Sequence, residues 1–181
     1  LVTSMGGYFL SRKNVMWKAP IAVAIVFTMY FSGGLIPRYF LIRGLGLDNS
    51  LFALIFPVLI DTYNLIIMRT AFASLPEALS ESAQIDGAGH LTILFKILLP
   101  LCGATIAVLS LYYAVGYWNA WFDAMIFIDK RSLFPLQLIL REIVMYNTAA
   151  DELVQLDNLD LAETIQYATI IVATLPILVV Y

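Results

Sequence analysis

The chain has 181 residues, of which 61% are hydrophobic and only 13% charged, and its mean hydropathy is +0.87. Soluble domains carry about a quarter charged residues, so this composition excludes an ordinary soluble domain and favours an integral membrane protein. The net charge of −3 and the lack of a basic stripe argue against a nucleic-acid partner. Cys102 is the only cysteine, so an internal disulfide is excluded and we expect a small packing residue. His90 is the only histidine, which excludes a metal site built from histidines.

Four apolar segments have about the 20 residues that a membrane-spanning helix needs. We expect spans at residues 19–37, 49–68, 97–122 and 164–181, with residues 1–10 as the end of a further helix. The first residue is not Met, and both ends fall in uncharged runs, so we expect a fragment of a longer protein. The predicted fold class is all-α: a polytopic transmembrane helical bundle forming a single domain over residues 1–181, incomplete at both ends.

Alternate connections between spans share one side of the membrane. The connections 12–18 and 69–96 therefore lie together, and so do 38–48 and 123–163. The first pair is the denser in Lys and Arg, which predicts a cytoplasmic location. The second pair carries an acidic group that consists of Asp48, Asp123, Asp129, Glu142, Asp151, Glu152, Asp157, Asp160 and Glu163.

A polar helix and turn lie within the connection 70–96. Ser74 and Glu77 have the spacing of a capping box, which predicts a helix from about Pro76 to Asp86. Gly87 supplies the left-handed residue that ends such a helix. A second segment runs from His90 to Pro100, which can kink or open the next span. Periodicity alone leaves two interpretations open: a plain interfacial helix, or a helix that couples the membrane domain to a soluble partner.

The connection 119–162 is long and begins with interfacial aromatic residues. A surface helix is expected to start after Pro135. This connection is either a folded cap over the bundle or a docking surface for an external partner, because long ordered loops are often functional.

Two groups of residues are candidates for a translocation path. Asp61 and Asn64 are polar residues three positions apart within a predicted span, where a charge costs about 2.5–3.5 kcal/mol. They either contact cargo or tie one helix to another. The second group lies near the end of the next span, where it either stacks on sugar rings or anchors the helix at the interface. Its members are Tyr113, Tyr117, Trp118 and Asn119.

The polar connection resembles the cytoplasmic EAA loop of ABC importer permeases. Glu81, Gly87, Ile97 and Leu99-Pro100 match the family's Glu, Gly, Ile and Leu-Pro, whereas Ser82 replaces the usual small Ala. Segments 31–37, 64–69 and 118–124 are similar to oligosaccharide-importer permeases of the LplC type, related to the maltose permease MalG. The resemblance covers essentially the whole chain. Family members have six spans, so the first span and most of the second are expected to be missing here.

The resemblance implies a permease subunit for a sugar or oligosaccharide in the bacterial plasma membrane, with alginate or another acidic oligosaccharide as a substrate alternative. It implies a heterodimer with a second permease, two cytoplasmic ATPase subunits that bind ATP and Mg, and an extracytoplasmic solute-binding protein. The chain itself is then not an enzyme and binds no cofactor. Residues 74–90 form the coupling helix seated on one ATPase. The implied coupling residues are Glu77, Glu81, Ser82, Ala83, Asp86, Gly87, Ala88, Ile97 and Pro100.

Two other function classes compete with this interpretation. An ion-coupled secondary carrier needs intramembrane ionisable pairs and an inverted repeat, but Asp61 is the only acidic residue in a predicted span. An intramembrane enzyme needs a nucleophile or a cluster of His, Asp and Glu residues, and no such set is visible. The sequence also lacks a Walker A glycine loop, so we expect no ATP site in this chain.

Overall fold

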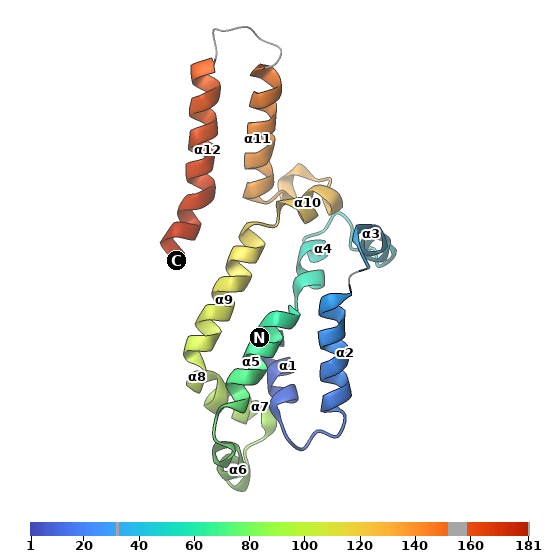
Figure 1. Cartoon of the computed structure of the whole chain (residues 1–181), viewed down its shortest axis with the longest axis vertical. Helices are drawn as coiled ribbons and strands as arrows, with labels where there is room; N and C mark the ends of the chain where they lie inside the picture. The colour runs from blue at the N-terminus through green and yellow to red at the C-terminus, as the bar shows by residue number, and fades with distance from the viewer. Residues whose placement is uncertain (32, 152–158, 181) are drawn as a thin grey trace. The chain divides into compact units, whose positions relative to one another are not determined.

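The computed structural model describes residues 1–31, 33–151 and 159–180, with side chains described at 1–31, 33–146 and 164–179. Every regular element in these ranges is helical, which confirms the predicted all-α class (Figure 1). The chain forms two compact units, Leu1–Leu41 with Ile55–Ser110 and Ile42–Leu54 with Leu111–Tyr181. Ser32 and the acidic side chains expected from Asp151 to Glu163 lie outside the described part.

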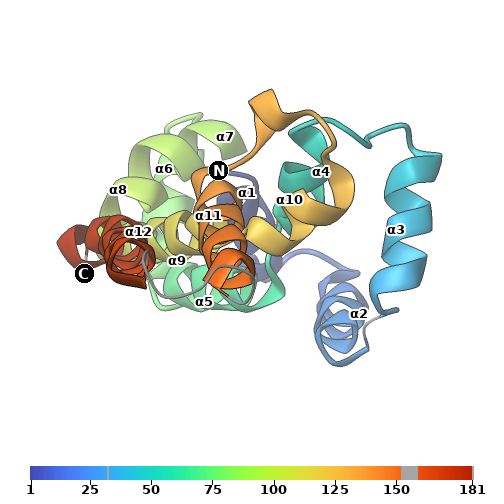
Figure 2. The same cartoon turned by 90° about the horizontal axis from the view of Figure 1, so that it is seen from above.

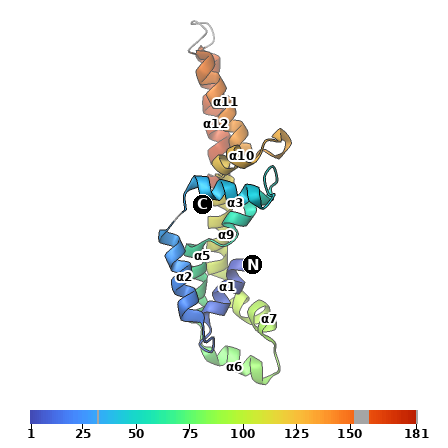
Figure 3. The ribbon, with the colours of Figure 1, turned by 90° about the vertical axis from the view of Figure 1, so that its right-hand side faces the viewer.

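The first unit is built on the close packing of α1 (Val2–Ser11) against α5 (Thr62–Ala73), which lie side by side in Figures 1 and 3. Two glycines of α1 allow this approach. A Cβ atom at Gly7 would lie 3.1 Å from the Arg69 backbone nitrogen, and one at Gly6 would lie 2.9 Å from the Leu65 side chain. Small residues bring helix backbones together in this way within membranes. The pair α1–α5 is therefore the base on which the rest of the unit packs.

The core of the first unit extends from this pair to the polar connection. Along the chain follow α6 (Glu77–Ile85), α7 (His90–Ile93), a π-helical turn (Leu94–Leu98) and α8 (Leu99–Leu101). One buried cluster joins these elements and comprises Tyr8, Met68, Phe72, Ala83, Ile93, Leu94, Leu98, Cys102 and Leu109. Cys102 is 6% exposed within it, which confirms its predicted packing role.

The predicted apolar segments are helical, but the first three are not the continuous helices that the sequence predicted. The segment 19–37 divides into α2 (Lys18–Tyr30) and α3 (Leu35–Gly44), because Gly34 takes a left-handed φ of 83° between them. Within the described residues, no one helix has both the length and the apolarity needed to cross a membrane. Three bent helix pairs meet both requirements by length and composition: α2 with α3, Phe52–Val58 with α5, and His90–Leu101 with Gly103–Trp118.

The other two breaks have local causes. The segment 49–68 contains α4 (Phe52–Ile55), a 3-10 turn at Phe56–Val58 and then α5, with a bend of 49°. Pro57 removes a backbone donor, and α5 starts afresh at its cap residue Asp61. The segment 97–122 bends by 89° where Cys102 leaves helical geometry, two residues after Pro100, before α9 (Gly103–Trp118). The kink expected from Pro100 is therefore present.

The second unit contains the long connection after α9. It includes α10 (Trp121–Phe127), a 3-10 turn (Arg131–Leu133), α11 (Leu136–Asp151) and α12 (Leu159–Val180). Helix α11 starts directly after Pro135, as predicted, and lies beside α12 (Figures 1 and 2). Helix α12 starts at Leu159, five residues before the predicted start of the span at 164.

A tight turn at Asn49 ties the start of this unit to its long connection. Its backbone N–H donates to the Phe127 carbonyl at 2.7 Å, and its Oδ1 accepts from the N–H groups of Asp129 and Lys130 at 3.2 and 3.0 Å. The connections 38–48 and 123–163 thus meet at one place, as the alternation of spans predicted.

Candidate functional site

The polar connection forms a short helix, α6, whose start differs from the prediction. Ser74 does not cap α6. Its Oγ donates instead to the Ala71 carbonyl at 2.7 Å and so closes the end of α5. Pro76 is the N-cap residue of α6, without a side-chain cap bond. The predicted capping box is therefore wrong, because Ser74 lies two residues before the N-cap position and Glu77 has another partner.

The end of α6 is built as predicted, by a left-handed glycine. Gly87 has a φ of 79°, and its N–H donates to the Gln84 carbonyl at 3.0 Å. The N–H of Ala88 donates to the Ala83 carbonyl at 2.9 Å. These two bonds are those of a Schellman motif, and Ala88 also packs against the buried cluster that contains Ala83. The last turn of α6 is therefore fixed both by backbone bonds and by an apolar contact.

Helix α6 is held by one buried residue and exposes almost everything else. Ala83 is 8% exposed, whereas Ile85 is 86% exposed and Leu79 is 39% exposed. Ser82 lies on the outer surface, and its Oγ donates to the Ala78 carbonyl at 2.7 Å. The replacement of the family's usual Ala thus leaves no hydroxyl unsatisfied.

The remaining residues expected to couple lie on this surface or behind it. Glu81 and Asp86 are exposed, and Asp86 is the C-cap residue of α6. Ile97 packs against the buried cluster, whereas Pro100 is exposed in the first turn of α8. The predicted coupling set therefore contains both outward-facing and core-facing residues.

Two consecutive basic residues between α1 and α2 reach this connection. Lys13 Nζ donates to Glu77 Oε2 at 2.5 Å, and Arg12 Nη1 lies 2.8 Å from His90 Nδ1 and 2.9 Å from Nε2. The sequence analysis used these residues for topology only and missed this role. Their contact with α6 and α7 confirms that the connections 12–18 and 69–96 lie together.

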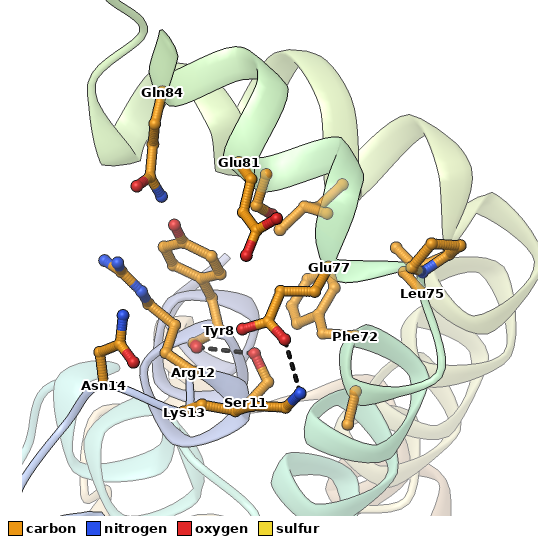
Figure 4. Close-up of a pocket in the computed structure, with 14 residues that line it drawn as sticks. Tyr8, Ser11, Arg12, Lys13, Asn14, Phe72, Leu75, Glu77, Glu81 and Gln84 are labelled. Carbon is orange, nitrogen blue, oxygen red and sulfur yellow. Dashed lines mark hydrogen bonds and ion pairs between the residues drawn. The ribbon is translucent and has the colours of Figure 1, made fainter.

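A cavity of about 200 Å³ separates the segment 11–14 from α6 (Figure 4). Glu77, Glu81 and Gln84 line its α6 side, and Arg12 and Lys13 line the other. Glu77 raises the pKa of Lys13, first through their hydrogen bond and then through charge attraction, to which Glu81 adds. A lysine whose pKa is raised in the folded state stabilises that state at every pH below its ordinary pKa. This contribution is lost only as the pH rises through the raised pKa. The ion pair is therefore intact throughout the neutral range.

Asp61 and Asn64 have a structural explanation that the sequence left as one alternative. Asp61 caps α5, since its Oδ1 accepts from the Asn64 backbone N–H at 2.8 Å. Asp61 thus lies at a break between helices, which corrects the prediction of a charge midway along a continuous span. Asn64 is 5% exposed, and no described group bonds its Oδ1.

Three of the other four path candidates lie on the part of α9 that belongs to the second unit, and Asn119 directly follows that helix. The rings of Tyr113 and Tyr117 stack with centroids 6.5 Å apart. Trp118 Nε1 donates to the Ala173 carbonyl of α12 at 3.0 Å, and Asn119 Nδ2 donates to the Val115 carbonyl at 3.0 Å. Trp118 and Asn119 therefore make contacts that position helices. Asp61 and Asn64 belong to the first unit, so the two groups are described separately.

An apolar chain of broken helices with a short polar helix between them is typical of the class of helical membrane domains. The family described as binding-protein-dependent transport system inner membrane component matches residues 14–181. The chain belongs to this family and is therefore a membrane protein.

Individual relatives support the family assignment. The polygalacturonan/rhamnogalacturonan transport system permease protein YtcP of Bacillus subtilis is 41% identical over 187 residues, covering 99% of this chain and 64% of YtcP. Protein LplC of the same organism is 39% identical over 176 residues, covering 96% of this chain and 60% of LplC. The chain thus spans about three-fifths of the length of these relatives.

A solved structure has the same fold. It is the crystal structure of a bacterial ABC transporter involved in the import of the acidic polysaccharide alginate. The TM-score is 0.85 at 29% identity, and the match covers 100% of this chain and 67% of the other chain. The broken helices described above therefore belong to an architecture that exists in an assembled transporter.

Proposed function

We propose that this chain is part of the permease subunit of an ATP-driven, binding-protein-dependent importer for a sugar or oligosaccharide. It forms a transmembrane domain over residues 1–181 of a multi-pass protein of the bacterial plasma membrane. Residues 70–96 are its cytoplasmic coupling loop, and residues 119–162 are its extracytoplasmic loop. The subunit pairs with a second, different permease, with two cytoplasmic ATPase subunits that bind ATP and Mg, and with an extracytoplasmic solute-binding protein. This chain provides the path and the coupling surface, and it catalyses no reaction.

The observation that carries the proposal is the surface of α6. A short polar helix, fixed at its end by the Schellman motif, holds the large apolar side chain of Ile85 at 86% exposure. Single exposed apolar side chains are ordinary on protein surfaces, and Ile85 supports the proposal because it lies in the loop that resembles the family's coupling loop, next to the Schellman motif that ends α6. Glu81 and Asp86 add charge beside it. A soluble ATPase subunit of complementary surface is the partner that the family resemblance implies.

Coupling follows from the difference in affinity between two conformations. ATP binding closes the ATPase pair and moves the surfaces on which the two permeases rest, and hydrolysis resets them. A ligand shifts such an equilibrium only by its differential affinity for the two states. A rigid α6 transmits the movement of the ATPase to the transmembrane helices, whereas a frayed α6 deforms and the helices stay in place.

The saccharide cargo is supported by the relatives. YtcP is named for polygalacturonan and rhamnogalacturonan, and the solved relative takes part in alginate import. An acidic oligosaccharide is therefore kept as the substrate alternative. These relatives do not favour an ion-coupled secondary carrier. Asp61, Asn64, Tyr113, Tyr117, Trp118 and Asn119 stay candidates for the path.

The test uses the full-length protein purified with its partner subunits. We expect Ile85→Asp to lower the amount of ATPase subunit that co-purifies, because a charge replaces the exposed apolar contact. Leu45→Asp is the matched control, since Leu45 is also exposed, at 63%, but lies in the connection 38–48. Equal retention of the ATPase by both variants would contradict the proposed role of α6.

A further inference from the structure

The end of α1 is tied to two helices of the coupling loop at corresponding places. Lys13 pairs with Glu77, the first residue of α6, and Arg12 contacts His90, the first residue of α7. Arg12 and Lys13 are neighbours in the sequence. Two links from one point of the chain to the starts of two helices fix the direction in which both helices leave.

We propose that Arg12 and Lys13 are positioning residues that clasp α6 and α7 to α1, so that a displacement of α6 moves α1 with it. The inference rests on the proposed coupling function of α6. It also assigns Glu77 a different role from that implied by the resemblance, because its carboxylate is directed to Lys13 of the same chain and not to an ATPase (Figure 4).

The clasp determines the directions of α6 and α7, and it contributes little to the free energy of folding. The side chains of Lys13 and Glu77 are 75% and 47% exposed, and such exposed pairs change an equilibrium constant by no more than about fivefold. The first unit is held together by its apolar cluster. The Tyr8 ring of α1 meets the Phe72 ring of α5 edge-on at 6.3 Å in this buried cluster, which also holds Ala83 of α6. Variants of the clasp should therefore still fold and insert.

Because of the surrounding charges, replacing Lys13 and replacing Glu77 should have unequal effects. Lys13 is attracted by Glu81 as well as by Glu77. Replacing Lys13 with glutamate gathers three carboxylates at one cavity and leaves Arg12, which contacts His90, as the remaining cation of the clasp. Replacing Glu77 with lysine brings two cations together, but the new lysine has Glu81 four residues later on the same helix face. We therefore expect Lys13→Glu to be the more disruptive change.

The experiment measures cargo taken up per ATP hydrolysed by the full-length assembly in proteoliposomes with its binding protein. Lys13→Glu should lower this ratio by about threefold or more, which lies within the range of an exposed pair. Glu77→Lys should lower the uptake per ATP less than Lys13→Glu does. The exchanged pair, Lys13→Glu with Glu77→Lys, should restore the ratio. Lys13→Arg alone should keep it at the native value. Asp48→Lys, a charge reversal at an exposed residue of the connection 38–48, is the control, with no expected change.

The outcomes separate the clasp from the proposed function. A normal ratio in Lys13→Glu, with ATPase retention lost in Ile85→Asp, overturns the clasp and leaves the coupling role of α6 standing. Normal results in both variants overturn both proposals. Impaired single variants that the exchanged pair does not restore overturn the pairing. A loss of uptake accompanied by an equal loss of thermal stability also overturns it, because that pattern indicates a merely structural role.

Discussion

Replacing Gly87 with valine should uncouple ATP hydrolysis from uptake while leaving the protein in the membrane. Gly87 has a φ of 79°, and a Cβ atom at this position would meet nothing within 4 Å. The cost of the substitution is therefore one of backbone conformation alone. A left-handed conformation costs an L-residue about 1–2 kcal/mol, and a β-branched side chain lies at the upper end of this range.

The chain can avoid this strain only by opening the last turn of α6. Opening gives up the bonds from the Gly87 and Ala88 N–H groups, at about 1 kcal/mol each. Either route thus costs about 2 kcal/mol, which corresponds to an increase of about 30-fold in the population of the frayed helix. The buried cluster loses little more than its contact with Ala88, so folding as a whole should persist.

The assay compares uptake per ATP hydrolysed with hydrogen exchange at the amides of Gly87 and Ala88. In Gly87→Val the exchange should rise by about 10- to 30-fold and the uptake per ATP should fall. Gly87→Asn should be mild, because asparagine tolerates the left-handed region. Gly89→Ser is the second control, since Gly89 has an ordinary φ of −70° at the start of α7. Fast exchange with fully coupled uptake would refute the link between a stiff α6 and transport.

Three further predictions concern single side chains. Glu81→Lys should insert normally but lower ATP-driven uptake, because it reverses an exposed charge of α6, and unchanged uptake kinetics would count against that surface. Asp61→Ala should lower the free energy of unfolding by about 1 kcal/mol because it removes the cap of α5, whereas Asp61→Asn should keep both the cap and the uptake. Loss of uptake in Asp61→Asn, measured in a transport assay, would instead place the Asp61 charge in the translocation path. Trp118→Phe should cost about 1 kcal/mol in thermal unfolding, since it removes the indole bond to Ala173, and an unchanged melting temperature would deny that bond a role.

The end of the polar helix was predictable because it depends on local chemistry. The left-handed glycine at 87 and the apolar position at 83 follow from short-range rules, and the structure has both. The start was not predictable in the same way. Ser74 is three residues before Glu77 and also follows directly on α5, and the sequence does not say which of two helices a serine serves. In the structure Ser74 bonds a carbonyl at the end of α5, that of Ala71, and so belongs to α5 and not to α6.

The sequence also missed the breaks between helices and the clasp. Composition and hydropathy located the apolar segments, but a window average does not report the breaks at Asp61 and Cys102, which depend on single residues. The clasp depends instead on long-range contacts. Arg12 and Lys13 were visible as charges on the side of the coupling loop, yet nothing in the sequence pairs them with His90 and Glu77, 78 and 64 residues away.

The structure divides the coupling residues into two physical roles that the sequence resemblance had joined. Ala83 and Ala88 face the buried cluster and Glu77 faces Lys13, so changes there should alter how α6 is held without altering what binds to it. Glu81 lines the same cavity as Glu77, whereas Ile85 and Asp86 are exposed away from the buried Ala83, and changes there should weaken the contact with a partner while α6 keeps its fold. Coupling requires that α6 contacts both the partner subunit and the rest of the helical bundle. Substitutions in either group of residues can therefore uncouple ATP hydrolysis from transport. ATPase retention distinguishes them: it should fall for the outward group and stay normal for the inward one.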